Sequence, residues 1–171
     1  MPELSLYTPP QERYATLDTL GFSGRIGRLR LLAWHMVLTA IACAASIVVL
    51  LTLKLSPTLG ITCGATLLVA YCFISVRISA QRLHDINWSA WMLLLHVIPL
   101  ANLVLLLMML LMPGTPGPNK YGLPPPPNSR AVNVLACTAI FLVALGMVAM
   151  IALFALGLLA SLINAANSNS L

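Results

Sequence analysis

The stretch RISAQRLHDINWSAW, residues 77–91, gathers ionisable side chains between two long apolar runs. Arg82 and Asp85 lie three positions apart, so on a helix they share one face and can form an ion pair. His84 projects from a different face, so its place next to Asp85 in the sequence does not by itself make a catalytic couple. The cluster could be a structural ion-pair network, a site for a lipid headgroup or another ligand, or, least of all, an acid–base centre.

Asp85 is the only acidic residue after Asp18. A carboxylate at an anionic membrane surface is poorly placed unless a cation neutralises it. We therefore expect Asp85 to pair with Arg82, Arg28 or Arg25, and we expect the structural ion-pair network more than a ligand site.

The segment GRIGRLR, residues 24–30, places three arginines just before the first apolar run. One interpretation is a basic anchor that sets the orientation of the following helix. The other is a cradle for a phospholipid headgroup, because guanidinium groups match phosphate oxygens in geometry and charge. The segment lacks the G-K-[ST] ending of a nucleotide phosphate loop.

The composition indicates lipid as the solvent of most of the chain. Of its 171 residues, 60% are hydrophobic and only 8% are charged, whereas a soluble domain carries roughly 25% charged residues. The net charge of +5 comes from cations scattered between apolar runs, so we predict no nucleic-acid partner. Four cysteines lie inside apolar runs without a C-x-x-C pair, and we predict neither a metal site nor a cofactor.

We predict an all-α fold, a polytopic transmembrane helix bundle with four apolar segments. Each segment is about long enough to cross a hydrocarbon core of about 30 Å. A polar, basic N-terminal arm over residues 1–30 would be cytoplasmic, and residues 164–171 would form a polar tail. The transmembrane domain over residues 31–163 would contain spans at about 31–53, 59–76, 90–112 and 131–163.

The third run allows two topologies. If it crosses as one helix kinked at Pro99, six of the nine Lys and Arg share the cytoplasmic side with both termini. If it is a re-entrant hairpin, eight of nine are cytoplasmic and the C-terminus is outside. Charge favours the hairpin and length favours the crossing. We predict the crossing, because one helix leaves fewer backbone groups unsatisfied in lipid. The loop around Asn119 and Tyr121 would then lie across the membrane from Arg82.

His96 and Asn102 are polar residues within the predicted membrane region, where no run carries a charge near its middle. Ion and proton pathways usually contain an intramembrane charged residue, so its absence counts against a transporter. We interpret the two as donors and acceptors between helices, or as the lining of a small polar cavity near Pro99. The pattern Gly60-x-x-x-Gly64 predicts close helix packing, within the chain or with a second copy.

Three segments together resemble one family. FSGRIGR at residues 22–28, RLHDINWSAW at 82–91 and PGTPGPNKYG at 113–122 resemble the DUF805 family of bacterial inner-membrane proteins, over roughly residues 20–125. The chain departs from the family pattern at Gln81, Asn87 and Ala90. The fourth apolar run looks like an addition to the family core.

The resemblance implies an integral inner-membrane protein and transfers no reaction. The residues that match family positions, and that form our candidate ligand or headgroup site, are Arg25, Arg28, Arg82, His84, Asp85, Asn119 and Tyr121.

We predict a non-enzymatic binding or accessory module of the bacterial cytoplasmic membrane. Its cytoplasmic Arg/His/Asp surface would engage anionic phospholipid or a membrane partner, which could be a second copy. The alternatives are a small transporter or channel subunit and, more weakly, a lipid-headgroup enzyme that uses His84 and Asp85.

Overall fold

The computed structural model of the chain describes residues 14–18 and 21–168, and every regular element in that part is helical. The predicted all-α fold class is therefore confirmed. Parts of the predicted N-terminal arm and tail, residues 1–13, 19–20 and 169–171, lie outside the described residues.

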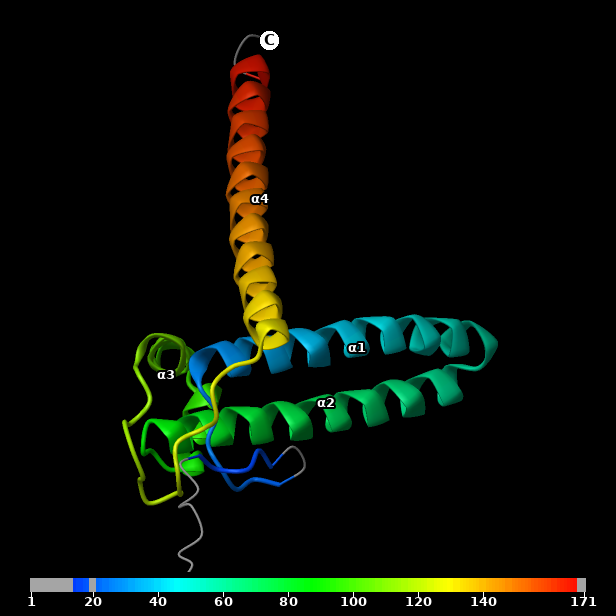
Figure 1. Ribbon diagram of the computed structural model, residues 1–171. Helices are drawn as coiled ribbons and strands as arrows, with labels where there is room; N and C mark the ends of the chain where they lie inside the picture. The colour runs from blue at the N-terminus through cyan, green and yellow to red at the C-terminus, as the bar shows by residue number, and fades with distance from the viewer. Residues whose placement is uncertain (1–13, 19–20, 169–171) are drawn as a thin grey trace, which may run out of the picture.

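Helices α1 (Arg28–Leu55) and α2 (Pro57–Asp85) form a long antiparallel hairpin (Figure 1). Ser56 is extended between them, and Pro57 begins α2, where its missing N–H removes no helical hydrogen bond. Gly60 lies directly against Leu53, because an added Cβ would come within 2.5 Å of the Leu53 Cα. The G-x-x-x-G pattern therefore serves packing within the chain.

The third apolar run does not form one crossing helix, so that prediction is wrong. It divides into η1, a 3-10 helix (Ala90–Val97), and α3 (Pro99–Leu111). Ile98 between them is extended, as expected for a residue before proline, whose ring disfavours helical backbone at that position. The 13 residues of α3 extend about 20 Å, which is too short for the hydrocarbon core.

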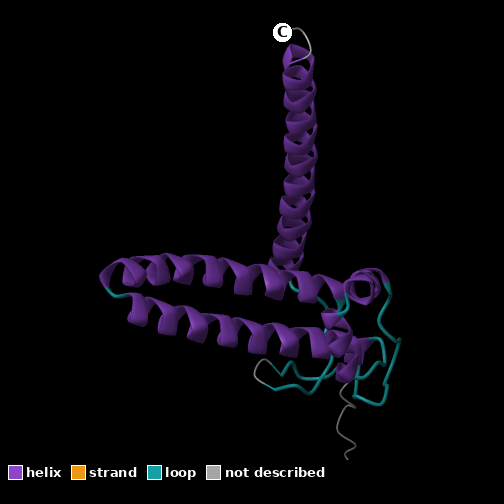
Figure 2. Cartoon of the chain, turned by 180° about the vertical axis from the view of Figure 1, so that it is seen from behind, coloured by secondary structure: helices purple, strands orange, loops and turns teal. Residues whose placement is uncertain are grey.

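Helix α3 lies across the axis of the α1–α2 hairpin, beside the beginning of α1 (Figure 1). Seen from behind, the loops that follow α2 and α3 gather at this same end (Figure 2). Most of the buried apolar core lies here as well, in a cluster that includes Ile26, Leu83 and Met109. We call this end of the hairpin the base.

Helix α4 (Arg130–Ser168) leaves the hairpin at a steep angle (Figure 1). Its early residue Ala136 is buried, whereas the apolar side chains from Ile140 to Ile163 are exposed around the helix. A helix that is apolar on all sides is typical of a membrane span. Three described helices are long and apolar enough to cross a membrane: α1, α2 and residues 130–164 of α4.

The contact at Gly60 gives the first testable prediction. Gly60→Ala should lower the free energy of unfolding by about 1–3 kcal/mol, because the new methyl group must displace Leu53 backbone. Gly146→Ala is the matched control, since its added Cβ meets no atom within 4 Å. Thermal unfolding in detergent measures both. Equal unfolding temperatures for the two variants would contradict this packing.

Candidate functional site

The centre of the base is an ion-pair network of Arg25, Arg82 and Asp85. The Arg25 guanidinium donates from Nε and Nη2 to Asp85 Oδ1, at 3.2 and 3.1 Å. Arg82 Nη1 donates to Asp85 Oδ2 at 2.6 Å. All three side chains are at most 3% exposed. The predicted pairing of Asp85 is confirmed, with two of the three candidate arginines.

Arg82 also holds the end of α3. Its Nε donates to the carbonyl of Met109 at 2.7 Å, and its Nη2 donates to the carbonyl of Met112. Arg28 Nη1 adds a hydrogen bond to the carbonyl of Leu111 at 3.1 Å. The last carbonyls of a helix have no partners within it, and cations are favoured there by the helix dipole. Two arginines therefore provide hydrogen-bond donors for the free carbonyls at the C-terminus of α3.

The loop after α3 packs against Asp85 and Arg25. Thr115 donates from its backbone N–H and from Oγ1 to the carbonyl of Asp85, both at 2.8 Å. Arg25 donates to the carbonyls of Thr115 at 2.6 Å and Gly117 at 2.8 Å. At Gly114 an added Cβ would lie 2.1 Å from Asp85 Oδ2, so the position has no room for a side chain.

Asn119 and Tyr121 meet His84 at the edge of this network. Asn119 Nδ2 donates to the carbonyl of His84 at 2.8 Å. The Tyr121 ring stacks on the imidazole, with ring centroids 3.9 Å apart and planes inclined by 12°. We predicted that this loop lies across the membrane from Arg82, and that prediction is wrong. The chain turns back at Pro99, so that α3 packs on η1, and all three family-like segments meet at the base.

The N-terminal arm is fastened to α2 mainly by a residue that sequence reasoning did not select. The buried amide of Gln81 donates to the carbonyls of Asp18, Gly21 and Ser23, at 2.7, 3.0 and 3.0 Å. Arg77 Nε also donates to Gly21 O at 3.2 Å. The signal in the sequence was the departure at Gln81 from the family pattern, inside the polar end of α2.

The pair His84 and Asp85 is not arranged as a catalytic couple. Both Asp85 carboxylate oxygens accept hydrogen bonds from arginines, and the His84 ring lies against Tyr121. The structure gives no support to the enzyme alternative that used these two residues.

His96 and Asn102 lie on different elements. His96, on η1, is exposed and lines a cavity of about 200 Å³ together with Tyr71, Ser75 and Ser79. Asn102 lies on α3 and is not part of that lining. The structure does not bring the two together in this cavity.

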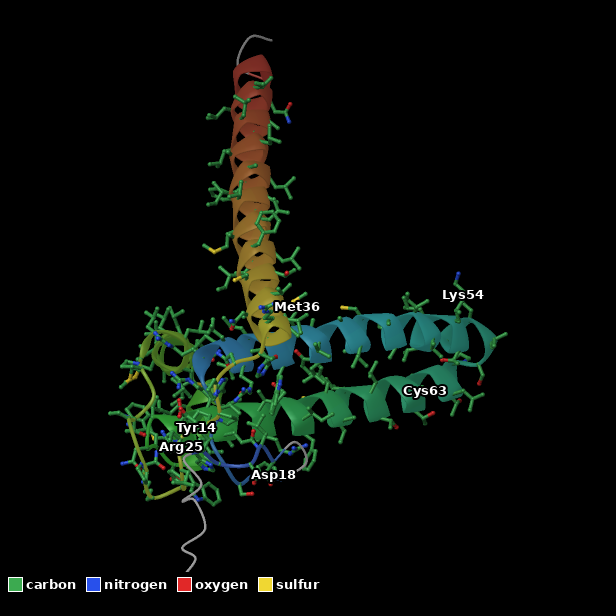
Figure 3. All side chains as sticks on the ribbon, in the orientation of Figure 1. Tyr14, Asp18, Arg25, Met36, Lys54 and Cys63 are labelled. Atoms are coloured by element: carbon green, nitrogen blue, oxygen red, sulfur yellow. The ribbon has the colours of Figure 1, made fainter. Side chains whose placement is uncertain are left out.

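Most of the cations that the structure describes gather at the base. Figure 3 labels Arg25 at this end of the hairpin and Lys54 at the opposite tip. Among the eight Lys and Arg that the structure describes, Lys54 lies at the far tip and the other seven lie at or next to the base. We call these seven the cationic base: Arg25, Arg28, Arg30, Arg77, Arg82, Lys120 and Arg130. Three of its members, Arg28, Lys120 and Arg130, are exposed.

The network at Asp85 gives the second testable prediction. Asp85→Asn should lower the free energy of unfolding by about 3–5 kcal/mol, because two buried guanidinium groups lose their counter-charge. Lys54→Gln, which removes one exposed charge at the far tip, should change stability little. Thermal unfolding at constant lipid composition tests the pair. An Asp85→Asn protein as stable as Lys54→Gln would mean that the carboxylate is not needed to neutralise the arginines.

Comparison with known proteins places this architecture in a family. No curated protein and no solved structure matches the chain. The family described as "Protein of unknown function (DUF805)" matches residues 19–123, more than half of the chain. The match contains the ion-pair network, η1, α3 and the loop around it, and it ends before α4 begins. The chain is therefore a member of the DUF805 family.

Proposed function

We propose that this protein is a non-enzymatic module of the bacterial cytoplasmic membrane whose cationic base binds anionic lipid headgroups. The observation that carries the proposal is the gathering of seven cations at one end of an apolar hairpin, against two described acidic residues, Asp18 and Asp85. Each Lys or Arg near an anionic membrane surface contributes about 1 kcal/mol of attraction.

The members of the cationic base have different parts in this proposal. Arg25 and Arg82 donate to Asp85 and to carbonyls of the chain itself. The general attraction to headgroups at the membrane surface therefore comes mainly from the exposed cations, Arg28, Lys120 and Arg130. The other residues of our candidate site, among them Asn119 and Tyr121, would hold the loop that carries Lys120.

The distribution of charge also supports an orientation. With the loop at the base, eight of the nine Lys and Arg would lie on the same side of the membrane as the N-terminal arm. This count includes Arg13 by its place in the sequence. Positively charged segments remain in the cytoplasm, so the base would be cytoplasmic. Helices α1, α2 and α4 would cross, and the C-terminus would lie outside.

A bilayer constrains the angle of α4. Spanning helices are tilted by at most about 40° from the membrane normal. Helix α4 stands steeply to the α1–α2 hairpin in Figure 1 and contacts α1 through its first turns. Crossing together with α1 and α2 would require α4 to turn about these contacts toward the axis of the hairpin.

The third prediction tests this orientation with single cysteines at Lys120 and Lys54, in a chain whose four native cysteines are replaced. In intact cells a membrane-impermeant maleimide should label the cysteine at position 54 and not the one at position 120. Both should react after permeabilisation. Labelling of position 120 in intact cells would place the loop outside and contradict a cytoplasmic base.

The fourth prediction concerns lipid. Phosphatidylglycerol should raise the unfolding temperature of the protein in nanodiscs more than phosphatidylcholine does, because only the former carries net negative charge. The difference should shrink in the double variant Arg28→Gln/Lys120→Gln. Lys54→Gln, at the opposite tip, is the control variant and should show the same difference between the two lipids as the wild type. Equal stabilisation of the wild type by both lipids would contradict headgroup binding. These cations would then serve only to set the orientation of the helices in the membrane.

A further inference from the structure

A groove of about 470 Å³ lies between α1, α2 and the first turns of α4. Its lining is apolar except for Arg77, and it includes Trp34, Val37, Ile41, Val132 and Leu135. Val37 and Ile41 are 40% and 61% exposed, so the groove is open to the surroundings of the helices. The volume lies within the range of about 300–1,000 Å³ that is usual for ligand pockets.

We propose that this groove is a specific site for one anionic phospholipid, with an acyl chain along the groove and the phosphate at its arginine end. The inference deepens the proposed function and rests on it. It adds a defined binding position to a general attraction between the cationic base and anionic headgroups.

Next to the arginine end, one helical turn before the lining begins on α1, the chain has a buried donor without a hydrogen-bond partner. Arg30 lies one helical turn before Ala33 and Trp34, which line the groove, and it is 3% exposed. Its Nη2 donates to the carbonyls of Pro126 and Pro127 at 3.3 and 3.2 Å, whereas its Nη1 is buried without a hydrogen-bond partner. A buried charged donor without an acceptor is costly, and a phosphate oxygen is an acceptor that suits guanidinium.

Two further cations adjoin the same end of the groove. Arg77 is part of the lining, and the exposed Arg130 directly precedes the lining residue Ala131. No acidic side chain is part of the lining. The charge therefore favours an anion, and the apolar walls favour a ligand that also carries a hydrocarbon chain.

The direction of the groove matches the arrangement of a phospholipid. Along α1 its lining runs from Ala33 to Ile41, nine residues that extend about 12 Å. This course leads from the cationic base toward the middle of the hairpin. A headgroup at the base would thus place its acyl chain parallel to α1, in the groove that α1, α2 and the first turns of α4 line.

The test compares two tryptophan variants on α1. Val37→Trp fills the groove, whereas Ile47→Trp adds the same ring at an exposed position outside its lining. Native mass spectrometry of protein released from nanodiscs measures retained phosphatidylglycerol, with diacylglycerol of the same chains as the uncharged comparison. We expect the wild type and Ile47→Trp to retain phosphatidylglycerol and not diacylglycerol. Val37→Trp should retain it about tenfold less tightly.

The outcomes separate this inference from the proposed function. If phosphatidylglycerol raises the unfolding temperature of the wild type no more than phosphatidylcholine does, the proposed function fails and the specific site is contradicted as well. If Val37→Trp keeps the full preference of the wild type, the groove is not the site, while the proposed function stands.

A second measurement uses the unchanged chain, in case the larger side chain disturbs folding. Phosphatidylglycerol with a photoreactive group in its acyl chain should label peptides that contain residues 33–41 and 131–135. Labelling spread evenly along the exposed part of α4, without enrichment at the groove, would overturn the inference.

Discussion

A single buried carboxylate organises the base of this protein. Asp85 accepts hydrogen bonds from Arg25 in the N-terminal arm and from Arg82 in α2, and its backbone carbonyl accepts two from Thr115 in the loop after α3. Arg82 in turn reaches the carbonyls of α3 at Met109. Three guanidinium donors point at one carboxylate because buried charges must be paired. Three segments far apart in the sequence, namely the N-terminal arm, the end of α2, and α3 with the loop after it, meet as a consequence of that requirement.

The rest of the hairpin has weaker means of holding its geometry. In lipid, apolar side chains gain little by turning from acyl chains to one another, so helices associate through close contact and polar groups. Gly60 supplies close contact with α1. His35 lies 3.2 Å from the hydroxyl of Ser75, and the hydroxyls of Thr39 and Tyr71 are 3.3 Å apart. These contacts hold α1 beside α2, while the network at Asp85 fixes α3 and the beginning of the loop after it.

Much of this arrangement could be predicted from the sequence, and the part that could not has a physical reason. The length of the apolar runs was enough to predict helices α1, α2 and α4. The spacing of Arg82 and Asp85 was enough to predict that they pair. Between residues 90 and 112 the length of the apolar run led to the wrong prediction of one crossing helix, because a continuous apolar run does not show whether its backbone turns back. The partners of Arg82 and Arg28 are carbonyls of α3. Every residue carries a carbonyl, so no pattern of side chains reveals that α3 ends there. The count of Lys and Arg did favour a hairpin, and it was the better guide.

That count treats all cations alike, although the structure separates them. Arg25 and Arg82 are buried and hold the chain together, while Lys120 and Arg130 lie at the surface. Arg28 does both, because it is exposed and also donates to the carbonyl of Leu111. The buried arginines bring the loop with Lys120 to the base, so the fold itself increases the positive charge on one side of the membrane. Topology and folding are thus coupled through the same residues. Helix α4, beyond the family match, is tied to this base by contacts with α1 and by the loop that Arg30 holds. Because the exposed length of α4 makes no further contact with the described helices beyond those first turns, its angle in a bilayer is left to lipid thickness and to what fills the groove beside α1.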